Sequence, residues 1–463
     1  MGQSKLFIDF GSTYTKVVAF DLEREELLGR VQAPSTVGTD IMLGLEAALS
    51  LMAEIVPVSA AMRRQAVASS SAAGGLRVVC VGLVPEYTTE AARMAALGAG
   101  ARIVGTCSYE LTRREMSEIE RLAPDIVLLT GGTDGGNRRV ITANGRMLAL
   151  SKVVKNIIVA GNKSARDDLE DAFASSSINV VYTDNAMPEI GILNLDKVNA
   201  QIRDLFLHRI TEAKGISRVR SVISGVIMPT PAAVMAAAQL LAQGVKGRAG
   251  LGELLLVDVG GATTDVYSVA KGLPTRTGVT MLGLPQPWAK RTVEGDLGLF
   301  HNLDALAELA ATGDGASPPG DLVQRLQANN GLPADEDVPG HLHLSRLAVK
   351  TAVDRHVGRI EQVYTVQGEH FVQRGKDLTR IQLLIGAGGP VAFSPDPLQV
   401  LSGAIFEETA ANVLKPVSPS VLLDERYILF AIGLLAQSEP AKALTIAKKY
   451  LKTLRKEGWP CST

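Results

Sequence analysis

Two segments far apart in the chain share a pattern of residue types suited to holding a phosphate chain. Residues 8–17 and 257–266 each run from an apolar strand into an aspartate, through a glycine-containing turn with hydroxyl side chains, into a second strand. Small turn residues let backbone N–H groups approach an anion, and an aspartate at a strand end can hold a metal-bound water. A single hairpin of this kind is as often an ordinary β-turn, but two could clamp a polyphosphate from opposite sides. The candidates are Asp9, Gly11, Ser12, Thr13 and Lys16 in the first hairpin and Asp258, Gly260, Gly261, Ala262 and Thr263 in the second, with the two aspartates holding the metal.

A third glycine-rich segment and a pair of acids add to these candidates. Gly386, Gly388 and Gly389 follow an apolar run, so their bare backbone could admit the flat face of a nucleoside. Glu294 and Asp296 flank a glycine, and either carboxylate could orient an attacking water or complete the shell of a metal. The same acids are also typical of the solvated start of a helix.

The apolar pattern predicts the elements that must position these residues. Each hairpin reads as strand, turn and strand, and an alanine-rich helix ending at Gly244 precedes the second hairpin. Along the chain we expect strands at 5–10, 16–20, 221–228, 254–259, 266–270 and 381–385, and helices from about 40, at 195–213 and from about 342 to 364.

Between the two hairpins the pattern changes to a regular alternation of short apolar runs and helical segments. The alternation predicts a parallel sheet with helices on both faces, which is a doubly wound α/β unit. A loop with four glycines, residues 130–136, follows the third run, where doubly wound sheets bind ligands, so we expect it to bind a ligand or partner rather than to be a plain connection. The five runs are 78–81, 101–104, 126–129, 157–160 and 178–182, with helix starts expected at Thr88, Thr112 and Ser164.

Composition narrows the classes of function. Lys and Arg number 47 and Asp and Glu 48, so the formal net charge of −1 provides no field to hold a nucleic-acid backbone. The longest apolar run, 428–436, is too short to span a membrane, and the N-terminal segment has no signal-peptide pattern. We therefore expect no nucleic acid and no membrane as partners, and a cytoplasmic protein.

Several catalytic motifs do not occur. The sequence contains no GxxxxGK[ST], HExxH or GxSxG motif. The alternating segment resembles the flavodoxin-like fold that holds cobalamin in mutases, but it has no histidine, so direct cobalt ligation is not expected.

The order of these motifs resembles the actin, Hsp70 and sugar-kinase superfamily of two-lobed ATPases. Residues 9–16 and 258–265 stand where that superfamily has its two phosphate motifs, and 386–389 stand where it has its adenosine motif. The resemblance places the first connecting helix near 294–298 and the second at about 427–436. It implies an α/β fold of two actin-like lobes with an inserted doubly wound domain, divided as 1–75 first lobe, 76–194 insert, 195–252 return to the first lobe and 253–463 second lobe.

Within this superfamily the chain is most similar to the MutL-type glutamate mutase accessory proteins (GlmL), which are unrelated to the mismatch-repair proteins of the same short name. Residues 124–136, 257–266 and 293–298 carry the resemblance, while Ala262 stands where many relatives of the wider superfamily have a third glycine. The resemblance implies ATP and Mg²⁺ as cofactors, an adenosylcobalamin-dependent mutase as partner and an ATP-driven reactivating role. A small-molecule kinase and a nucleotide-switched assembly protein remain alternatives, and the oligomeric state is not indicated.

Overall fold

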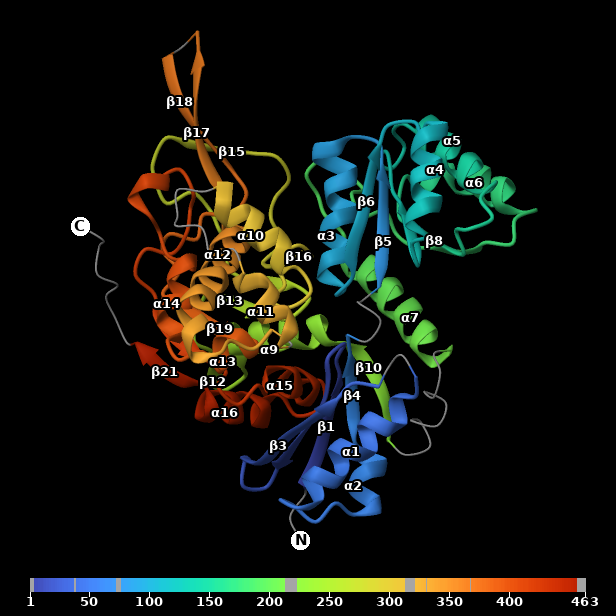
Figure 1. Ribbon diagram of the computed structural model, residues 1–463. Helices are drawn as coiled ribbons and strands as arrows, with labels where there is room; N and C mark the ends of the chain where they lie inside the picture. Colours follow the sequence, from blue (N-terminus) through green and yellow to red (C-terminus); the bar gives the residue numbers. More distant parts are fainter. Residues whose placement is uncertain are drawn as a thin grey trace.

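The computed structural model consists of two lobes and an inserted domain, with the first lobe at the bottom of Figure 1, the second at the left and the insert at the upper right. It describes residues 4–36, 39–71, 76–212, 223–312, 321–329, 331–366 and 368–455. The predicted fold class, two actin-like lobes with an inserted doubly wound domain, is confirmed.

The first lobe is built on a five-stranded sheet in the order β10-β4-β1-β2-β3. Strands β1 and β2 form the predicted first hairpin, and β4 and β10 extend the sheet in parallel with β1. The elements are β1 (Ser4–Phe10), β2 (Tyr14–Asp21), β3 (Glu26–Pro34), α1 (Ile41–Ala53), α2 (Ala60–Gln65), β4 (Val67–Ser70) and β10 (Gly225–Pro229).

The second lobe is built on a six-stranded sheet in the order β16-β14-β13-β19-β20-β21. Strands β13 and β14 form the second hairpin, and β19, which ends in the third glycine segment, runs parallel to β13. The strands are β13 (Leu254–Val259), β14 (Thr264–Val269), β16 (Ala289–Glu294), β19 (Leu383–Ala387), β20 (Ser420–Leu423) and β21 (Lys452–Arg455). The helices include α10 (Leu303–Thr312), α11 (Leu322–Ala328), α12 (Val338–His356), α13 (Gly389–Ala392), α14 (Pro397–Leu401), α15 (Leu429–Ala436) and α16 (Pro440–Tyr450).

Two crossed helices connect the lobes. Helix α15 packs on α9 (Thr230–Gln243), and a Cβ added at Gly433 would lie 1.8 Å from the carbonyl oxygen of Ala233, so only glycine permits this close approach. The second connecting helix is therefore found where it was predicted. The prediction of the first connecting helix near 294–298 is wrong, because those residues form the end of strand β16 and a turn. The helix that packs on α15 is α9.

Strand alternation decides which residues face these crossed helices. Phe7 of β1 and Leu256 of β13 pack in the same core as α9 and α15, whereas their neighbours Ile8 and Val257 point to the outer cores. The aspartates two residues further along each strand lie on the inner faces as well. Because side chains alternate along a strand, Asp9 and Asp258 both lie on the sheet faces that are turned toward the helices α9 and α15.

The insert has the predicted doubly wound topology. Its five strands form a parallel sheet in the order β6-β5-β7-β8-β9. Thr112 caps α4 as expected, but Asn162 rather than Ser164 caps the turn before α6, and Thr88 lies inside a π-helical turn before α3. The elements are β5 (Arg77–Gly82), α3 (Glu90–Gly98), β6 (Arg102–Ser108), α4 (Arg113–Leu122), β7 (Ile126–Leu129), α5 (Arg139–Leu148), β8 (Asn156–Val159), α6 (Arg166–Phe173), β9 (Asn179–Tyr182) and, on the return to the first lobe, α7 (Asp196–Glu212).

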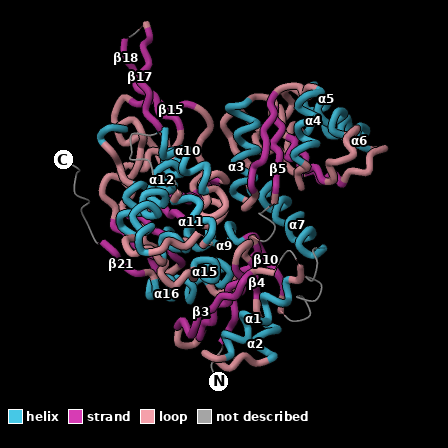
Figure 2. The backbone as a smooth tube through the Cα atoms, in the orientation of Figure 1, coloured by secondary structure: helices cyan, strands magenta, loops and turns pink. Residues whose placement is uncertain are grey.

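The long helix expected from about 342 to 364 is shorter than predicted. It ends at His356, and the chain continues as β17 (Arg359–Thr365) and β18 (Gly368–Arg374), which with β15 (Val279–Leu282) form a small sheet. Figure 2 shows this hairpin projecting from the second lobe as a pair of magenta strands. Gly358 interrupts the helical pattern there, and β-branched and aromatic residues suited to a strand follow at Ile360, Val363, Tyr364 and Thr365. No helix in the described part of the chain is long and apolar enough to cross a membrane.

Candidate nucleotide site

The first hairpin holds its aspartate in a network of neutral and cationic donors. Asp9 is 1% exposed, and its Oδ2 lies 3.1 Å from the ammonium of Lys16, the residue directly across the strand pair. The hydroxyl of Thr230 donates to Asp9 Oδ1 at 2.6 Å, and the hydroxyl of Ser69 lies 3.4 Å from the same atom. Ser69 lies opposite Asp9 on the neighbouring strand β4, and Thr230 begins α9. Neither was predicted, because only the fold brings them to the hairpin.

Lys16 points from the first hairpin toward the second lobe. Its ammonium lies 4.0 Å from the centre of the Tyr427 ring. Burial lowers the pKa of Lys16, but Tyr427 and Asp9 outweigh that effect, so the pKa lies above its ordinary value. The lysine is therefore a cation fixed between the lobes, as phosphate binding requires.

The second hairpin presents an acid without a partner. Among the described residues Asp258 has no hydrogen-bond or ion-pair partner, although it lies at the end of a buried strand. Burial and, to a smaller extent, the charge of Asp265 raise the pKa of Asp258 to about 7, although Lys16 opposes the rise. An unpaired carboxylate of this kind is suited to accept a hydrogen bond from a metal-bound water or a proton from an attacking one.

A second buried acid completes the group from the side of the connecting helix. Asp424 is 2% exposed and accepts hydrogen bonds from the backbone N–H groups of Ile428 and Leu429 at the start of α15. Burial raises its pKa to about 6, despite these donors. Asp258, Asp424 and Thr230 line a cavity of about 20 Å³, room for roughly one water molecule.

The metal prediction depends on water-mediated contacts. Among the described residues no group of three or more acidic, cysteine or histidine side chains is spaced to hold a metal ion. That Asp9 and Asp258 hold Mg²⁺ stays a prediction, and it requires contacts through the waters that this ion tends to retain. The unpartnered oxygens of Asp258 fit such a contact, while Asp9 is already paired with Lys16.

The two turns have matching geometry. The N–H of Gly11 donates to the carbonyl of Tyr14 at 3.1 Å, and the N–H of Gly260 donates to the carbonyl of Thr263 at 2.9 Å. Ser12 and Thr13 are exposed, as donors to a ligand have to be. In the second turn, N–H groups of residues 299–301 and the amide of Asn302 bind the carbonyls of 260–262 from behind.

The third glycine segment divides into structural and open positions. A Cβ at Gly388, where φ is 90°, would lie 2.0 Å from the carbonyl oxygen of Val259, and one at Gly386 would lie 2.7 Å from Leu401. A Cβ at Gly389 would meet only Phe393, at 3.9 Å. Packing therefore accounts for Gly386 and Gly388, and only Gly389 leaves open space for a nucleoside.

Glu294 and Asp296 bind a different partner, although Glu294 lies across the strand pair from Thr264 of the second hairpin. They stand at the end of β16 and in the following turn, and both carboxylates bind Nη1 of Arg355, at 2.7 and 3.0 Å. The expected helix start is therefore wrong. The expectation that either acid orients water stays a prediction.

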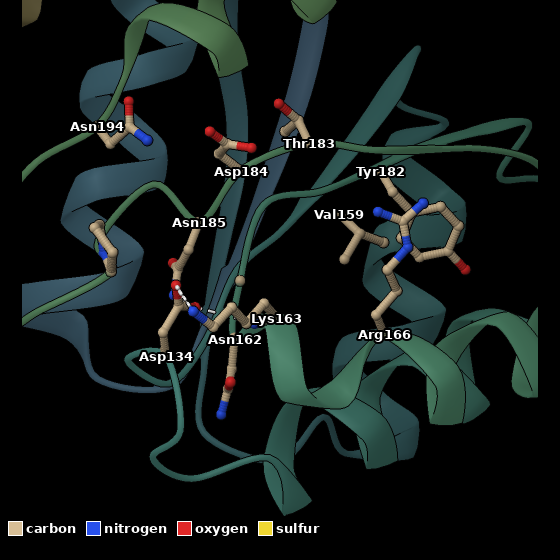
Figure 3. A pocket seen from close by; sticks show the side chains of 12 residues that line it. Asp134, Val159, Asn162, Lys163, Arg166, Tyr182, Thr183, Asp184, Asn185 and Asn194 are labelled. Carbon is tan, nitrogen blue, oxygen red and sulfur yellow. Dashed lines mark hydrogen bonds and ion pairs between the residues drawn. The ribbon is translucent and has the colours of Figure 1, made fainter.

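A cavity of about 380 Å³ lies beside the glycine loop 130–136 of the insert. Asp134 of that loop accepts hydrogen bonds from the backbone N–H of Lys163 and the side-chain amide of Asn185, both at 3.0 Å. Figure 3 shows the side chains of these residues around the pocket. On another wall the guanidinium of Arg166 lies 5.0 Å from the centre of the Tyr182 ring. The cavity lies at the strand ends where a ligand was expected. Its charged side chains already have partners, Asp134 with Lys163 in the wall and Arg166 and Asp184 with Glu170 and Lys197 outside it, and ligand binding stays a prediction.

The sheets, the crossed helices and the two facing hairpins define a two-lobed protein with an actin-like fold. A family model described as MutL protein matches residues 5–451. Protein MutL from Clostridium tetanomorphum is 42% identical over 463 residues, covering 96% of this chain and 98% of that protein. The chain therefore belongs to the MutL family, and the predicted resemblance is confirmed.

Solved structures that match most of the chain share little sequence with it. A xyloylose kinase from Brucella ovis matches 99% of this chain and 94% of its own, with 12% identity and a TM-score of 0.35. The ethanolamine utilization protein EutJ from Carboxydothermus hydrogenoformans matches 96% of this chain and 90% of its own, with 10% identity and a TM-score of 0.26. These scores are low, so the fold assignment depends on the topology and the crossed helices described above.

Proposed function

We propose that the chain binds Mg-ATP between the two hairpins and hydrolyses it, and that the resulting lobe movements reactivate an adenosylcobalamin-dependent mutase such as glutamate mutase. The observation that carries the proposal is Asp258, an acid with no partner among the described residues, facing the Asp9–Lys16 pair of the other lobe. The mutase partner comes from the family resemblance.

The chain's own groups have separate roles in this proposal. Lys16, fixed by Asp9 and Tyr427, meets the phosphate charge as a point cation. Exposed Ser12 and Thr13 donate hydrogen bonds from one side, and the second turn does so from the other. Mg²⁺ would supply charge neutralisation at the phosphates, and Asp258 would hold its waters. Closure of the lobes about α9 and α15 would exclude bulk water.

The first experiment measures the nucleotide step alone. Wild-type protein and the Asp258→Asn variant are titrated with ATP with and without Mg²⁺ by calorimetry, and phosphate release is followed in the absence of any acceptor. Slow acceptor-free hydrolysis that is lost in the variant supports the proposal. Transfer to a small metabolite would instead identify a kinase, and binding without turnover an assembly switch.

The second experiment tests the partner. A mutase inactivated by turnover is mixed with the protein, Mg-ATP and fresh adenosylcobalamin, and substrate rearrangement is followed. Recovery should require ATP and should fail with the Asp258→Asn variant. Removing residues 76–182 is a poor control, because Val78, Ala91 and Ala95 of the insert share a core with Ile8 of the first lobe. No recovery by the wild-type protein would contradict the reactivating role.

A further inference from the structure

The C-terminal turn of α3, residues 97–102, lies where the insert meets both lobes. On the first-lobe side, a Cβ added at Gly100 would lie 3.0 Å from the Pro229 side chain and 3.4 Å from the backbone nitrogen of Ala232. Between those two residues stands Thr230, whose hydroxyl binds Asp9. The turn is thus in van der Waals contact with the segment that holds the first aspartate.

On the second-lobe side, the same turn is bound by a buried cation. Arg291 of β16 is 5% exposed, and its Nη1 donates to the carbonyl of Ala101 at 3.0 Å and lies 3.3 Å from that of Leu97. The Leu97 carbonyl, which also accepts a hydrogen bond from the N–H of Gly100, lies in the last turn of α3, and Ala101 follows that turn. A cation is favoured at this end of a helix. Arg291 therefore ties the insert to the edge strand of the second sheet.

The other edge of the Arg291 guanidinium binds the second phosphate-type hairpin. Its Nε and Nη2 lie 2.8 and 2.6 Å from Oδ1 of Asp265. The second oxygen of Asp265 accepts a hydrogen bond from the hydroxyl of Thr263 at 3.0 Å. A continuous path of side-chain bonds thus runs from the turn of the hairpin, through Asp265 and Arg291, into the insert.

The covalent connections make this path sensitive to lobe position. The insert enters and leaves the chain between elements of the first lobe, β4 and β10, yet Arg291 attaches it to the second lobe. When the lobes move apart, either the Arg291 bonds break or the insert follows the second lobe. Since Arg291 is buried, breaking its bonds leaves an uncompensated charge.

We propose that Arg291 and the C-terminal turn of α3 transmit the nucleotide state of the second hairpin to the insert. This inference rests on the proposed nucleotide binding and adds the route by which it reaches a partner-facing domain. When Thr263 turns its hydroxyl to a phosphate, Asp265 loses that hydrogen-bond donor, and its carboxylate moves relative to the guanidinium of Arg291. The planar fork of arginine is required, because a lysine cannot hold the carboxylate and both carbonyls at once.

The test is amide hydrogen exchange of the full-length protein with and without Mg-ATP. The N–H groups of residues 99–102 are all hydrogen-bonded and therefore report on the turn. In the wild-type protein, Mg-ATP should change their exchange rates by about fivefold or more. Arg291→Lys should bind Mg-ATP and lose that change. Arg325→Lys is the matched control, because Arg325 binds Asp337 in the same forked way inside the second lobe and should behave as wild type.

The outcomes separate the inference from the proposed function. If the wild-type protein does not bind Mg-ATP, the proposed function fails. If it binds Mg-ATP and residues 99–102 do not respond, or if Arg291→Lys binds and responds normally, the inference is overturned and nucleotide binding stands. Should Arg291→Lys be too unstable to bind, the wild-type response of residues 99–102 decides alone.

Discussion

In the β1–β2 hairpin the residue across from the aspartate is a lysine, and in the β13–β14 hairpin it is a second aspartate. The turns themselves match, with the same glycine N–H bonded to the carbonyl three residues later. Asp9 is therefore neutralised by Lys16 within its own hairpin, whereas Asp265 is neutralised from behind by Arg291 and Asp258 is left unpaired. One motif thus brings a fixed cation to the site, and the other brings a free acid.

The sharpest test of this difference replaces each strand-end aspartate by its neutral isostere. Asp9→Asn and Asp258→Asn should both abolish ATP hydrolysis, but their effects on stability should be opposite. Asp9→Asn leaves Lys16 buried without its carboxylate and should cost about 3 kcal/mol of unfolding free energy. Asp258→Asn removes a carboxylate whose ionised form is disfavoured by burial. It should therefore raise the unfolding free energy by about 1 kcal/mol at pH 8. Urea unfolding and phosphate release measure the two effects, and equal destabilisation would erase the contrast.

The second test removes the cation of the first hairpin. Lys16→Met should weaken Mg-ATP binding by about tenfold or more, because a charge-assisted contact with phosphate is lost. Lys449→Met is a suitable control, since Lys449 pairs with Glu26 on the surface, at 2.8 Å. Calorimetric titration of both variants checks the prediction, and unchanged affinity of Lys16→Met would remove Lys16 from the site.

The third test separates the two kinds of glycine in the third segment. Gly389→Ala places a methyl group in open space and should lower nucleotide affinity about tenfold by overlap with the nucleoside, at unchanged Tm. Gly388→Ala should lower Tm instead, because its Cβ meets the Val259 carbonyl at 2.0 Å. Wild-type affinity of Gly389→Ala would count against nucleoside binding at this segment.

The sequence predicted what depends on local pattern. Both hairpins and the doubly wound insert follow from apolar periodicity and glycine-containing turns, whereas α15 was placed by the family resemblance. It did not predict Ser69, Thr230 or Asp424, whose roles depend on strands and helices that only the tertiary fold brings beside the hairpins. Edge strands such as β16 were missed because their partly exposed residues lack a clear apolar alternation.

The fourth test uses pH to distinguish the two aspartates. The pKa of Asp258 is raised from its ordinary value of 3.8 to about 7, so the folded state binds this proton more tightly than the unfolded state. That contribution to stability is fully present below about pH 4 and is lost as pH rises to 7. Between pH 5 and 8 the wild-type protein should therefore lose more stability than Asp258→Asn, in unfolding experiments without nucleotide. Parallel pH profiles would contradict the raised pKa.

The smallest effect is expected at the two acids outside the facing hairpins. Glu294→Gln and Asp296→Asn each remove one partner of Arg355, whose side chain is 41% exposed and keeps the other acid. Exposed ion pairs contribute little, so hydrolysis should stay within about fivefold of wild type. Steady-state phosphate release by each variant checks this. A loss as large as that of Asp258→Asn would show that one of these acids orients the attacking water. The chemistry would then extend beyond the two hairpins to the end of β16, the strand that carries Arg291.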